Sequence, residues 1–236
     1  MNTTNLEMLE TIAEAMGDLC DSLVFVGGSV TGLYVDRPGA PEPRPTMDVD
    51  CITGIMSRLK FQELENAMRK KGFRNDQSQG APLCRWTFGP IILDLMPADS
   101  SILGFTNEWY RSGLSHTDDR ELASGTTIRI LTPPYFIASK LTALKSRGFR
   151  DLRTSRDFED IVYVLNNRRS VVDEILNADN EVRRHLVESF KELTANDSLM
   201  EAITVAMDFG EPKDTPRRIK ETIDRIATLG QTSPPG

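Results

Sequence analysis

The spacing of apolar residues changes character near residue 130, and this change constrains the fold more than any other feature of the chain. Before it, short β-rich runs such as residues 22–26 and 91–97 are typical of strands. Helical spacing over residues 6–20 and 57–72 predicts helices that flank these strands. After it, apolar residues recur almost everywhere three and four apart. The sequence therefore predicts an α+β fold. The predicted domains are a sheet-containing domain over residues 1–130, a helical domain over 131–230 and a disordered tail over 231–236.

Composition excludes several classes of protein. A net charge of −7 and a pI near 5.0 argue against a general nucleic-acid binder. The sequence has no apolar run of the ~18 to 20 residues that span a bilayer, and no signal-peptide pattern, so we expect a cytoplasmic protein without membrane contact. Cys20, Cys51 and Cys84 lack CxxC spacing and are expected to be buried free thiols. His116 and His185 have no ligand-like neighbours, and we assign neither a catalytic role.

Two acids stand one residue apart in MDVDCIT, a predicted strand. Side chains alternate along a strand, so Asp48 and Asp50 share one face while Val49 and Cys51 turn inward. Two neighbouring carboxylates repel each other unless a cation lies between them, and such hard oxygen ligands suit Mg²⁺ with substrate phosphates. The alternative is a DxD pair that occurs by chance on an exposed strand edge.

A glycine turn precedes this strand in the sequence. Residues 22–26 end at Gly27-Gly28-Ser29, where glycines permit close backbone approach and Ser29 is predicted to begin a helix whose N–H groups face a phosphate. Gly28 and Ser29 are therefore candidate nucleotide-binding residues, and a plain tight turn is the alternative. Between the turn and Asp48, residues 36–46 hold four prolines and a glycine and are predicted to form an extended loop.

A third acid lies in ILDLMP. The runs PLCRWTF and PIILDLMP, joined by Gly89-Pro90, are predicted to form a hairpin with Asp94 on its second strand. If that strand neighbours the strand of Asp48 and Asp50, all three carboxylates cluster.

The segments FVGGSV, MDVDCI and ILDLMP together resemble the signature of the polymerase-β-like nucleotidyltransferase superfamily. The resemblance implies a nucleotidyltransferase-type mixed sheet and an NTP substrate, such as ATP. It also implies two Mg²⁺ ions, or Mn²⁺, held by Asp48, Asp50 and Asp94, with Asp94 as base for the attacking hydroxyl. The interval between Ser29 and Asp48 is longer here than in many members of the superfamily.

The helical domain carries a lysine on a largely apolar helix face. Lys140 shares this face with Leu144 and Arg147, and a lysine in such a setting needs an anionic partner unless it snorkels to solvent. Asp157 and Asp160 are neighbours on a later helix, where salt bridges to arginines 153 or 156 are the structural alternative to a nucleotide role. Residues 140–156 contain six basic residues and one acid, Asp151, which predicts a positive patch; the alternative is a solvated helix face. The basic residues are Lys140, Lys145, Arg147, Arg150, Arg153 and Arg156.

This region resembles the AbiEii-type nucleotidyltransferase toxins, including the MenT-like enzymes, through a K-L-x-A-x-x-x-R segment followed by R-D-x-x-D-I. The resemblance implies that Lys140 contacts the triphosphate and that Asp157 or Asp160 holds the lysine or the nucleotide. It further implies a toxin that modifies the 3′ end of tRNA and is paired with an antitoxin protein. Two other readings stay open, namely nucleotidyl transfer to a small molecule such as an aminoglycoside, and a non-catalytic nucleotide-binding module.

Overall fold

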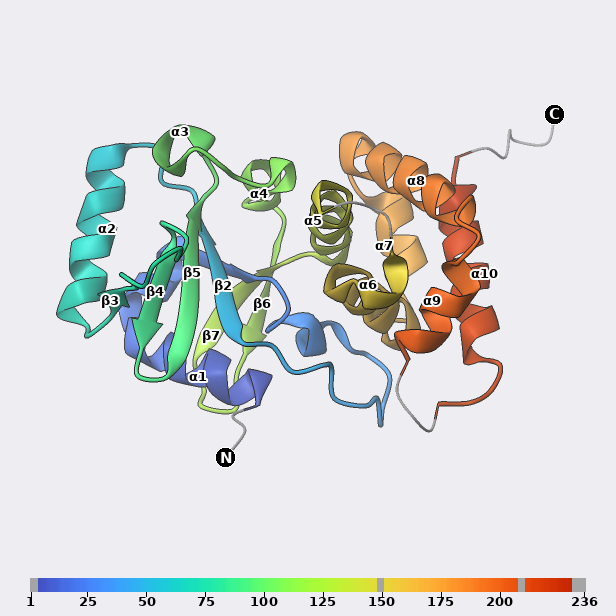
Figure 1. Ribbon diagram of the computed structural model, residues 1–236, viewed down its shortest axis with the longest axis horizontal. Coiled ribbons are helices and arrows are strands. Elements are labelled where there is room, and N and C mark those ends of the chain that lie inside the picture. The colour runs from blue at the N-terminus through green and yellow to red at the C-terminus, as the bar shows by residue number, and fades with distance from the viewer. Residues whose placement is uncertain (1–3, 148–150, 208–210, 231–236) are drawn as a thin grey trace. The chain divides into compact units, whose positions relative to one another are not determined.

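The computed structural model describes residues 4–147, 151–207 and 211–230, and it confirms the α+β class (Figure 1). The strands are β1 (Leu23–Val26), β2 (Asp48–Thr53), β3 (Arg74–Asn75), β4 (Arg85–Phe88), β5 (Ile91–Pro97), β6 (Thr117–Glu121) and β7 (Thr127–Leu131). Helices interleaved with them are α1 (Asn5–Met16), α2 (Arg58–Lys70), α3 (Ser100–Leu103) and α4 (Glu108–Gly113). The later helices are α5 (Pro133–Ser146), α6 (Arg156–Asn167), α7 (Val171–Asn177), α8 (Asn180–Thr194), α9 (Leu199–Val205) and α10 (Thr215–Ala227). Three short 3₁₀ helices are η1 (Gly17–Ser22), η2 (Thr31–Tyr34) and η3 (Leu152–Thr154).

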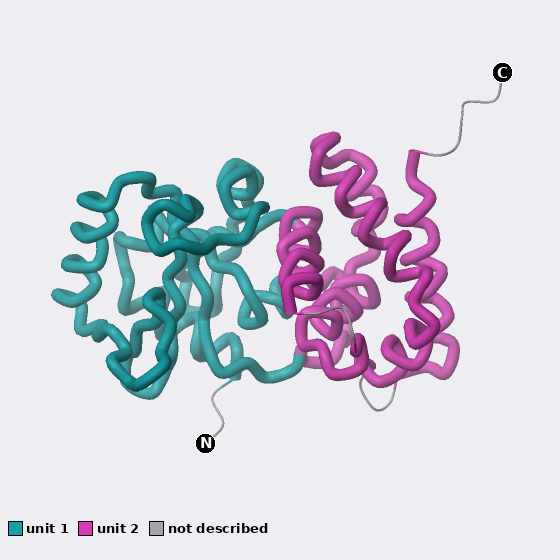
Figure 2. The backbone as a smooth tube through the Cα atoms, turned by 45° about the horizontal axis from the view of Figure 1, so that its top comes forward, with its two compact units in different colours: residues 1–33, 44–132 teal, residues 34–43, 133–236 magenta. Residues whose placement is uncertain are grey.

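The chain divides into two compact units (Figure 2). Unit 1 comprises Met1–Leu33 and Arg44–Thr132, and unit 2 comprises Tyr34–Pro43 and Pro133–Gly236. The chain therefore leaves unit 1 early, contributes ten residues to unit 2, and returns before it enters unit 2 again. The tail predicted over 231–236 lies outside the described residues.

Unit 1 is built on a seven-stranded mixed sheet with the order β3-β4-β5-β2-β1-β7-β6. β2 pairs in parallel with β5, and β1 pairs in parallel with β7, whereas the other neighbours are antiparallel. The predicted hairpin is present as β4 and β5, joined at Gly89-Pro90. β2 and β5, which carry the three predicted acids, are neighbours at the centre of the sheet.

Apolar side chains at helical spacing fix α1 against this sheet. Leu9, Ile12 and Met16 are fully buried, and α1 packs on β2. The helix begins in a capping box, in which Thr4 and Glu7 satisfy each other's backbone N–H groups. The predicted helix over residues 57–72 is present as α2.

One local prediction about the glycine turn is wrong. No α-helix begins at Ser29, which lies in a turn before the four-residue helix η2. Gly32 lies inside this stretch and Pro38 follows soon after it, so too few helix-favouring residues remain to offset the cost of nucleating a helix. Residues 36–46 have no helix or strand, as predicted.

Among the described residues of unit 2 from Pro133 onward, helices predominate and there is no strand. On α6, Phe158, Ile161 and Leu165 form the buried face, and α10 contributes Ile219 and Ile223 at the same spacing. The early segment Tyr34–Pro43 is hydrogen-bonded to this unit. The N–H groups of residues 36 and 37 donate to the carbonyl of residue 167 at 3.1 and 3.2 Å, and the hydroxyl of residue 163 donates to the carbonyl of residue 41 at 2.7 Å.

Candidate functional site: three carboxylates on adjacent strands

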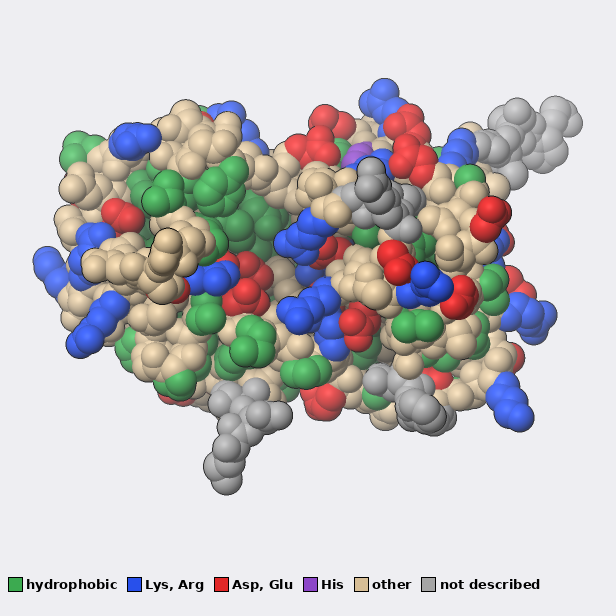
Figure 3. Space-filling view, viewed as in Figure 1, with side chains coloured by type: hydrophobic (Ala, Val, Ile, Leu, Met, Phe, Trp, Pro, Cys, Tyr) green, Lys and Arg blue, Asp and Glu red, His purple; other side chains and the backbone are tan. Residues whose placement is uncertain are grey.

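The register of the central strands places two of the predicted acids side by side. Asp50 on β2 is the direct parallel partner of Asp94 on β5, and Asp48 lies two residues earlier on β2. Paired residues on neighbouring strands point to the same face of a sheet, and adjacent strands run about 4.8 Å apart. The space-filling view shows acidic side chains gathered over these strands next to a basic one (Figure 3). The structure thus brings Asp48, Asp50 and Asp94 to one face.

The glycine turn lies directly against these acids. β1 pairs antiparallel with β2 so that Val26 faces Asp50, and Gly27 follows at once with a φ of 77°. A Cβ atom at Gly27 would lie 1.9 Å from Oδ2 of Asp50, so only glycine lets the carboxylate lean over the turn. At Gly28, a Cβ atom would lie 2.9 Å from a guanidinium nitrogen of Arg44. The two glycines therefore form a backbone surface, called the glycine cradle below, against which Asp50 and Arg44 pack.

Two hydroxyl groups belong to this region, that of Thr46 beside Gly28 and that of Ser29 next in the chain. Thr46 donates from Oγ1 to Oδ1 of Asp48 at 2.9 Å and so orients that carboxylate. Ser29 is 1% exposed, and its hydroxyl has no hydrogen-bond partner among the residues that the structure describes. A buried hydroxyl without a partner costs about 1–3 kcal/mol, and such groups in native proteins call for a ligand or a bound water.

A basic residue that the sequence analysis did not single out contacts the acids. Arg85 on β4 lies opposite Asp94 in the hairpin and donates to both of its carboxylate oxygens, at 2.9 Å from Nε and 2.7 Å from Nη2. The same Nη2 is 3.8 Å from Oδ2 of Asp48. The hydrogen bond to Asp94, together with the negative charge around it, raises the pKa of the Arg85 guanidinium. The hairpin register counted outward from Gly89-Pro90 would have placed Arg85 across from Asp94.

Cys84 and Cys51 lie beside the same acids, and both are expected to be protonated, unreactive thiols. Burial raises the pKa of the Cys84 thiol to about 11, with a further contribution from Asp94. Burial likewise raises the pKa of the Cys51 thiol. Cys20, Cys51 and Cys84 are all free and buried, as the sequence predicted. None of them offers a thiolate that could bind a metal near neutral pH.

The donor set suits a hard divalent cation. Carboxylates are the ligands that Mg²⁺ and Mn²⁺ prefer, and the cradle with the unsatisfied hydroxyl of Ser29 suits the phosphates that accompany these ions. Among the described residues, however, no group of three acidic, histidine or cysteine side chains is already arranged to hold an ion. Both oxygens of Asp94 are engaged by Arg85. The chemistry of the residues fits the metal, on condition that Arg85 releases Asp94.

The other predicted site residues form a buried ionic cluster inside unit 2. Lys140 on α5 lies 2.6 Å from Asp160 and 3.5 Å from Asp157, both on α6, and Asp157 also lies 2.6 Å from Arg147. Lys140, Asp157 and Asp160 are 7%, 4% and 1% exposed. The alternative of a salt bridge from these acids to Arg153 is wrong, because Arg153 pairs instead with acids 151 and 201. The acids hold Lys140 in place.

The predicted positive patch is largely compensated. Lys140, Arg147 and Arg153 have the carboxylate partners given above, and Lys145 lies 2.9 Å from Glu192. Arg150 lies outside the described residues, and Arg156, at the start of α6, is exposed. Lys140, Lys145, Arg147 and Arg153 are therefore each paired with a carboxylate and are not unpaired positive charges available to an RNA backbone.

Within the described residues, no helix combines the length and the apolar character needed to cross a bilayer.

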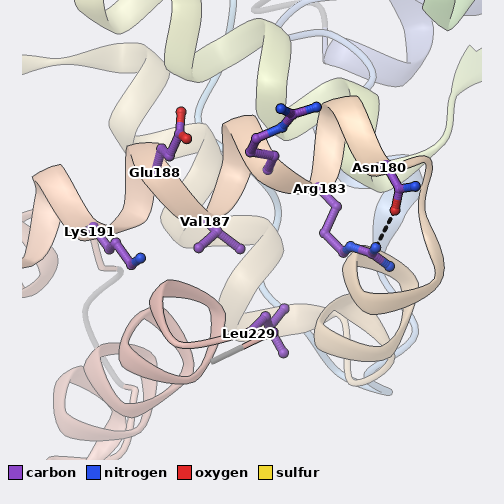
Figure 4. A pocket seen from close by; sticks show the side chains of 8 residues that line it. Asn180, Arg183, Val187, Glu188, Lys191 and Leu229 are labelled. Carbon is purple, nitrogen blue, oxygen red and sulfur yellow. Dashed lines mark hydrogen bonds between the residues drawn. The ribbon is translucent and has the colours of Figure 1, made fainter. Parts of the chain in front are cut away.

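Two hollows lie away from the carboxylates. One, of about 590 Å³, lies in unit 1 at the end of β2 that follows Thr53, and Lys60 and Arg129 contribute to its lining. The other, of about 530 Å³, lies in unit 2 between α8 and the residues after α10 (Figure 4). There Arg183 donates to the side chain of Asn180. None of the predicted site residues lines either hollow.

No protein-family model and no curated protein matches the chain. Among solved structures, the chain is similar to an antigenic nucleotidyltransferase-like protein from Paracoccidioides brasiliensis, with a TM-score of 0.48 and 17% identity over 85% of this chain and 92% of that one. It is also similar to a proposed nucleotidyltransferase from H. pylori, with a TM-score of 0.45 and 14% identity over 96% of this chain and 92% of that one. Identities this low leave the function to be argued from the side chains themselves.

Proposed function

We propose that the chain is a divalent-metal-dependent nucleotidyltransferase that moves a nucleoside monophosphate from an NTP to an acceptor hydroxyl and releases pyrophosphate. The observation that carries the proposal is the register of β2 and β5, which places Asp50 beside Asp94 and next to the glycine cradle. Neighbouring like charges repel, and Arg85 contributes one positive charge against the three carboxylates on this face, so a divalent cation would balance the remaining charge.

Each residue of the site has a part in this reaction. Asp48, Asp50 and Asp94 would hold Mg²⁺ or Mn²⁺, which when bound would stabilise negative charge on the attacking and leaving oxygens. The hydroxyl of Ser29 and the backbone of Gly28 would bind phosphate oxygens. In keeping with the superfamily resemblance, Asp94 would accept the proton of the acceptor hydroxyl as that oxygen attacks the α-phosphate. Thr46 would keep Asp48 in position through the hydrogen bond already present.

The acceptor is a separate part of the proposal. The resemblance to AbiEii-type toxins favours the 3′ end of tRNA as acceptor and an antitoxin protein as partner. It also assigns Lys140 and either Asp157 or Asp160 to the nucleotide. The pairing of these three residues inside unit 2 is compatible with a lysine that the acids hold in position.

The test is transfer of label from each of four NTPs, supplied separately with Mg²⁺, to total tRNA or to an aminoglycoside. Asp50→Asn removes a metal ligand at constant size. Asp119→Asn, at an exposed position on β6, is the matched control in the same unit. Outer-shell partners of metal sites already contribute about 10- to 100-fold to activity, so loss of a direct ligand should reduce transfer by at least about 100-fold.

Label on tRNA that Asp50→Asn removes and Asp119→Asn preserves would support both the reaction and the toxin-type acceptor. Label on the aminoglycoside alone would keep the reaction and replace the acceptor. Wild-type protein that transfers no label to either acceptor, or Asp50→Asn protein that is as active as wild type, would contradict the proposed site.

A further inference from the structure

Arg85 occupies the carboxylate that a metal ion would need. Its guanidinium makes a two-point contact with Asp94, and one of its nitrogens also approaches Asp48. The side chains of Arg85 and Asp94 are 25% and 12% exposed, so the pair is partly shielded from solvent. Two-point arginine–carboxylate contacts of this kind are among the stronger hydrogen-bonded pairs in proteins.

A divalent cation and Arg85 cannot both hold Asp94 in this way. The guanidinium uses one lone pair on each carboxylate oxygen and places a positive charge directly against this carboxylate. Two positive groups at one carboxylate repel each other, and the repulsion is stronger where solvent is partly excluded. When no cation is bound, on the other hand, Arg85 offsets the mutual repulsion of Asp48 and Asp94.

We propose that Arg85 competes with the divalent cation for Asp94, so that metal binding requires Arg85 to release this carboxylate. This inference rests on the proposed function, because it assumes that Asp48, Asp50 and Asp94 are metal ligands. Arg85 is then a positioning residue that sets metal affinity. A hydrogen bond to a charged group contributes about 1.5–3 kcal/mol, so removing the competitor should tighten metal binding by about 10- to 100-fold.

The experiment measures Mn²⁺ binding to the full chain without nucleotide, by electron paramagnetic resonance of the free ion. Arg85→Met removes the charge and keeps an unbranched side chain of similar reach. Arg74→Met, at an exposed position on the adjacent strand β3, removes one positive charge from the same sheet without a carboxylate contact at the site. Arg85→Lys keeps the charge but cannot make the two-point contact.

We expect Arg85→Met to lower the Kd for Mn²⁺ by about 10- to 100-fold. Arg74→Met should change the Kd by less than about twofold, because exposed charges are strongly screened. Adding Asp94→Asn to Arg85→Met should abolish the gain. Thermal unfolding gives a second measurement, in which Arg85→Met should have a lower Tm than wild type without metal and a larger increase in Tm with Mn²⁺.

The outcomes separate this inference from the proposed function. If wild type binds Mn²⁺ and Asp94→Asn weakens that binding, the acids are metal ligands. In that case, equal Mn²⁺ affinities of wild type and Arg85→Met would contradict the proposed competition and leave the metal site in place. If Arg85→Met and wild type both fail to bind Mn²⁺, the competition and the metal site fall together. If Arg85→Met does not fold, Arg85→Lys decides the matter, since competition predicts tighter binding than wild type and its absence predicts no change.

Discussion

At the scale of single residues, Gly27 has the strictest requirement in the proposed site. Its φ of 77° is unfavourable for any residue with a Cβ atom, and that atom would also lie 2.7 and 2.9 Å from Cγ and Cβ of Asp50. Because these inner atoms also lie within 3.0 Å of the added atom, a rotation of the carboxylate alone cannot relieve the overlap. An alanine here would have to move the backbone of β2 or of the turn.

We therefore predict that Gly27→Ala lowers the free energy of unfolding by about 1–2 kcal/mol for the positive φ and by a further 1–3 kcal/mol for the overlap. Gly125→Ala is the matched control, since Gly125 has a φ of 83° and nothing within 4 Å of the added atom. Urea denaturation of both variants isolates the overlap as the difference between them. Equal losses would mean that Asp50 moves aside without cost, which contradicts the close contact described here.

Single residues also show where sequence reasoning reached its limit. The alternation in MDVDCIT and the flanking leucines of Asp94 were enough to predict which face the acids share. The contact between Arg85 and Asp94 follows from the hairpin register counted outward from Gly89-Pro90, a step that the sequence analysis did not take. The unsatisfied hydroxyl of Ser29 depends on how a whole turn packs and has no sequence pattern of its own.

At the scale of elements, α5 and α6 are joined by an ionic contact within an apolar surface. Lys140 lies among buried side chains of α5, and its partner Asp160 is almost fully buried on α6. A buried ion pair contributes little net stability when it is intact, but removal of one partner leaves an uncompensated charge that costs about 3–5 kcal/mol. The pair therefore makes the packing of these two helices sensitive to either residue.

We predict that Lys140→Met lowers the free energy of unfolding by about 3–5 kcal/mol and that adding Asp160→Asn recovers part of the loss. Lys145→Met is the control on the same helix. It breaks a more exposed pair with Glu192 and should cost less than about 1 kcal/mol. Chemical denaturation followed by circular dichroism measures all three. Similar stabilities for Lys140→Met and Lys145→Met would mean that the buried pair is not needed for packing, and would favour a purely nucleotide-binding role.

Elements were predicted unevenly by the sequence. Helices α1 and α2 have long apolar repeats and were predicted to within a few residues. The prediction of an α-helix at Ser29 was wrong. The few residues there do not favour a helix strongly enough to offset the cost of nucleation, because Gly32 and the prolines that follow disfavour it. The sheet order, in which β2 lies between β5 and β1, comes from contacts between distant segments. No window of local sequence contains that information.

At the scale of the whole molecule, the chain passes between the two units more than once. The segment Tyr34–Pro43 belongs to unit 2, although the strands before and after it belong to unit 1. The change in the spacing of apolar residues indicated a single boundary near residue 130. It could not reveal that residues 34–43 belong to unit 2, because this proline-rich segment has no regular apolar spacing. In unit 2 the segment is held in part by hydrogen bonds that the N–H groups of Asp36 and Arg37 donate to the carbonyl of Asn167.

This assignment predicts how the segment opens in hydrogen exchange. If Tyr34–Pro43 unfolds cooperatively with unit 2, the amides of Asp36 and Arg37 exchange only when α6 opens. Lys140→Met should then speed their exchange by about 100-fold for a loss near 3 kcal/mol, whereas Gly27→Ala should leave it unchanged and speed the amides of β1 and β2. Exchange measured by NMR on both variants decides the matter. If Gly27→Ala speeds the exchange of the Asp36 and Arg37 amides, the segment unfolds with unit 1. If neither variant changes their exchange, the segment opens by itself, and its hydrogen bonds to Asn167 do not couple it to either unit.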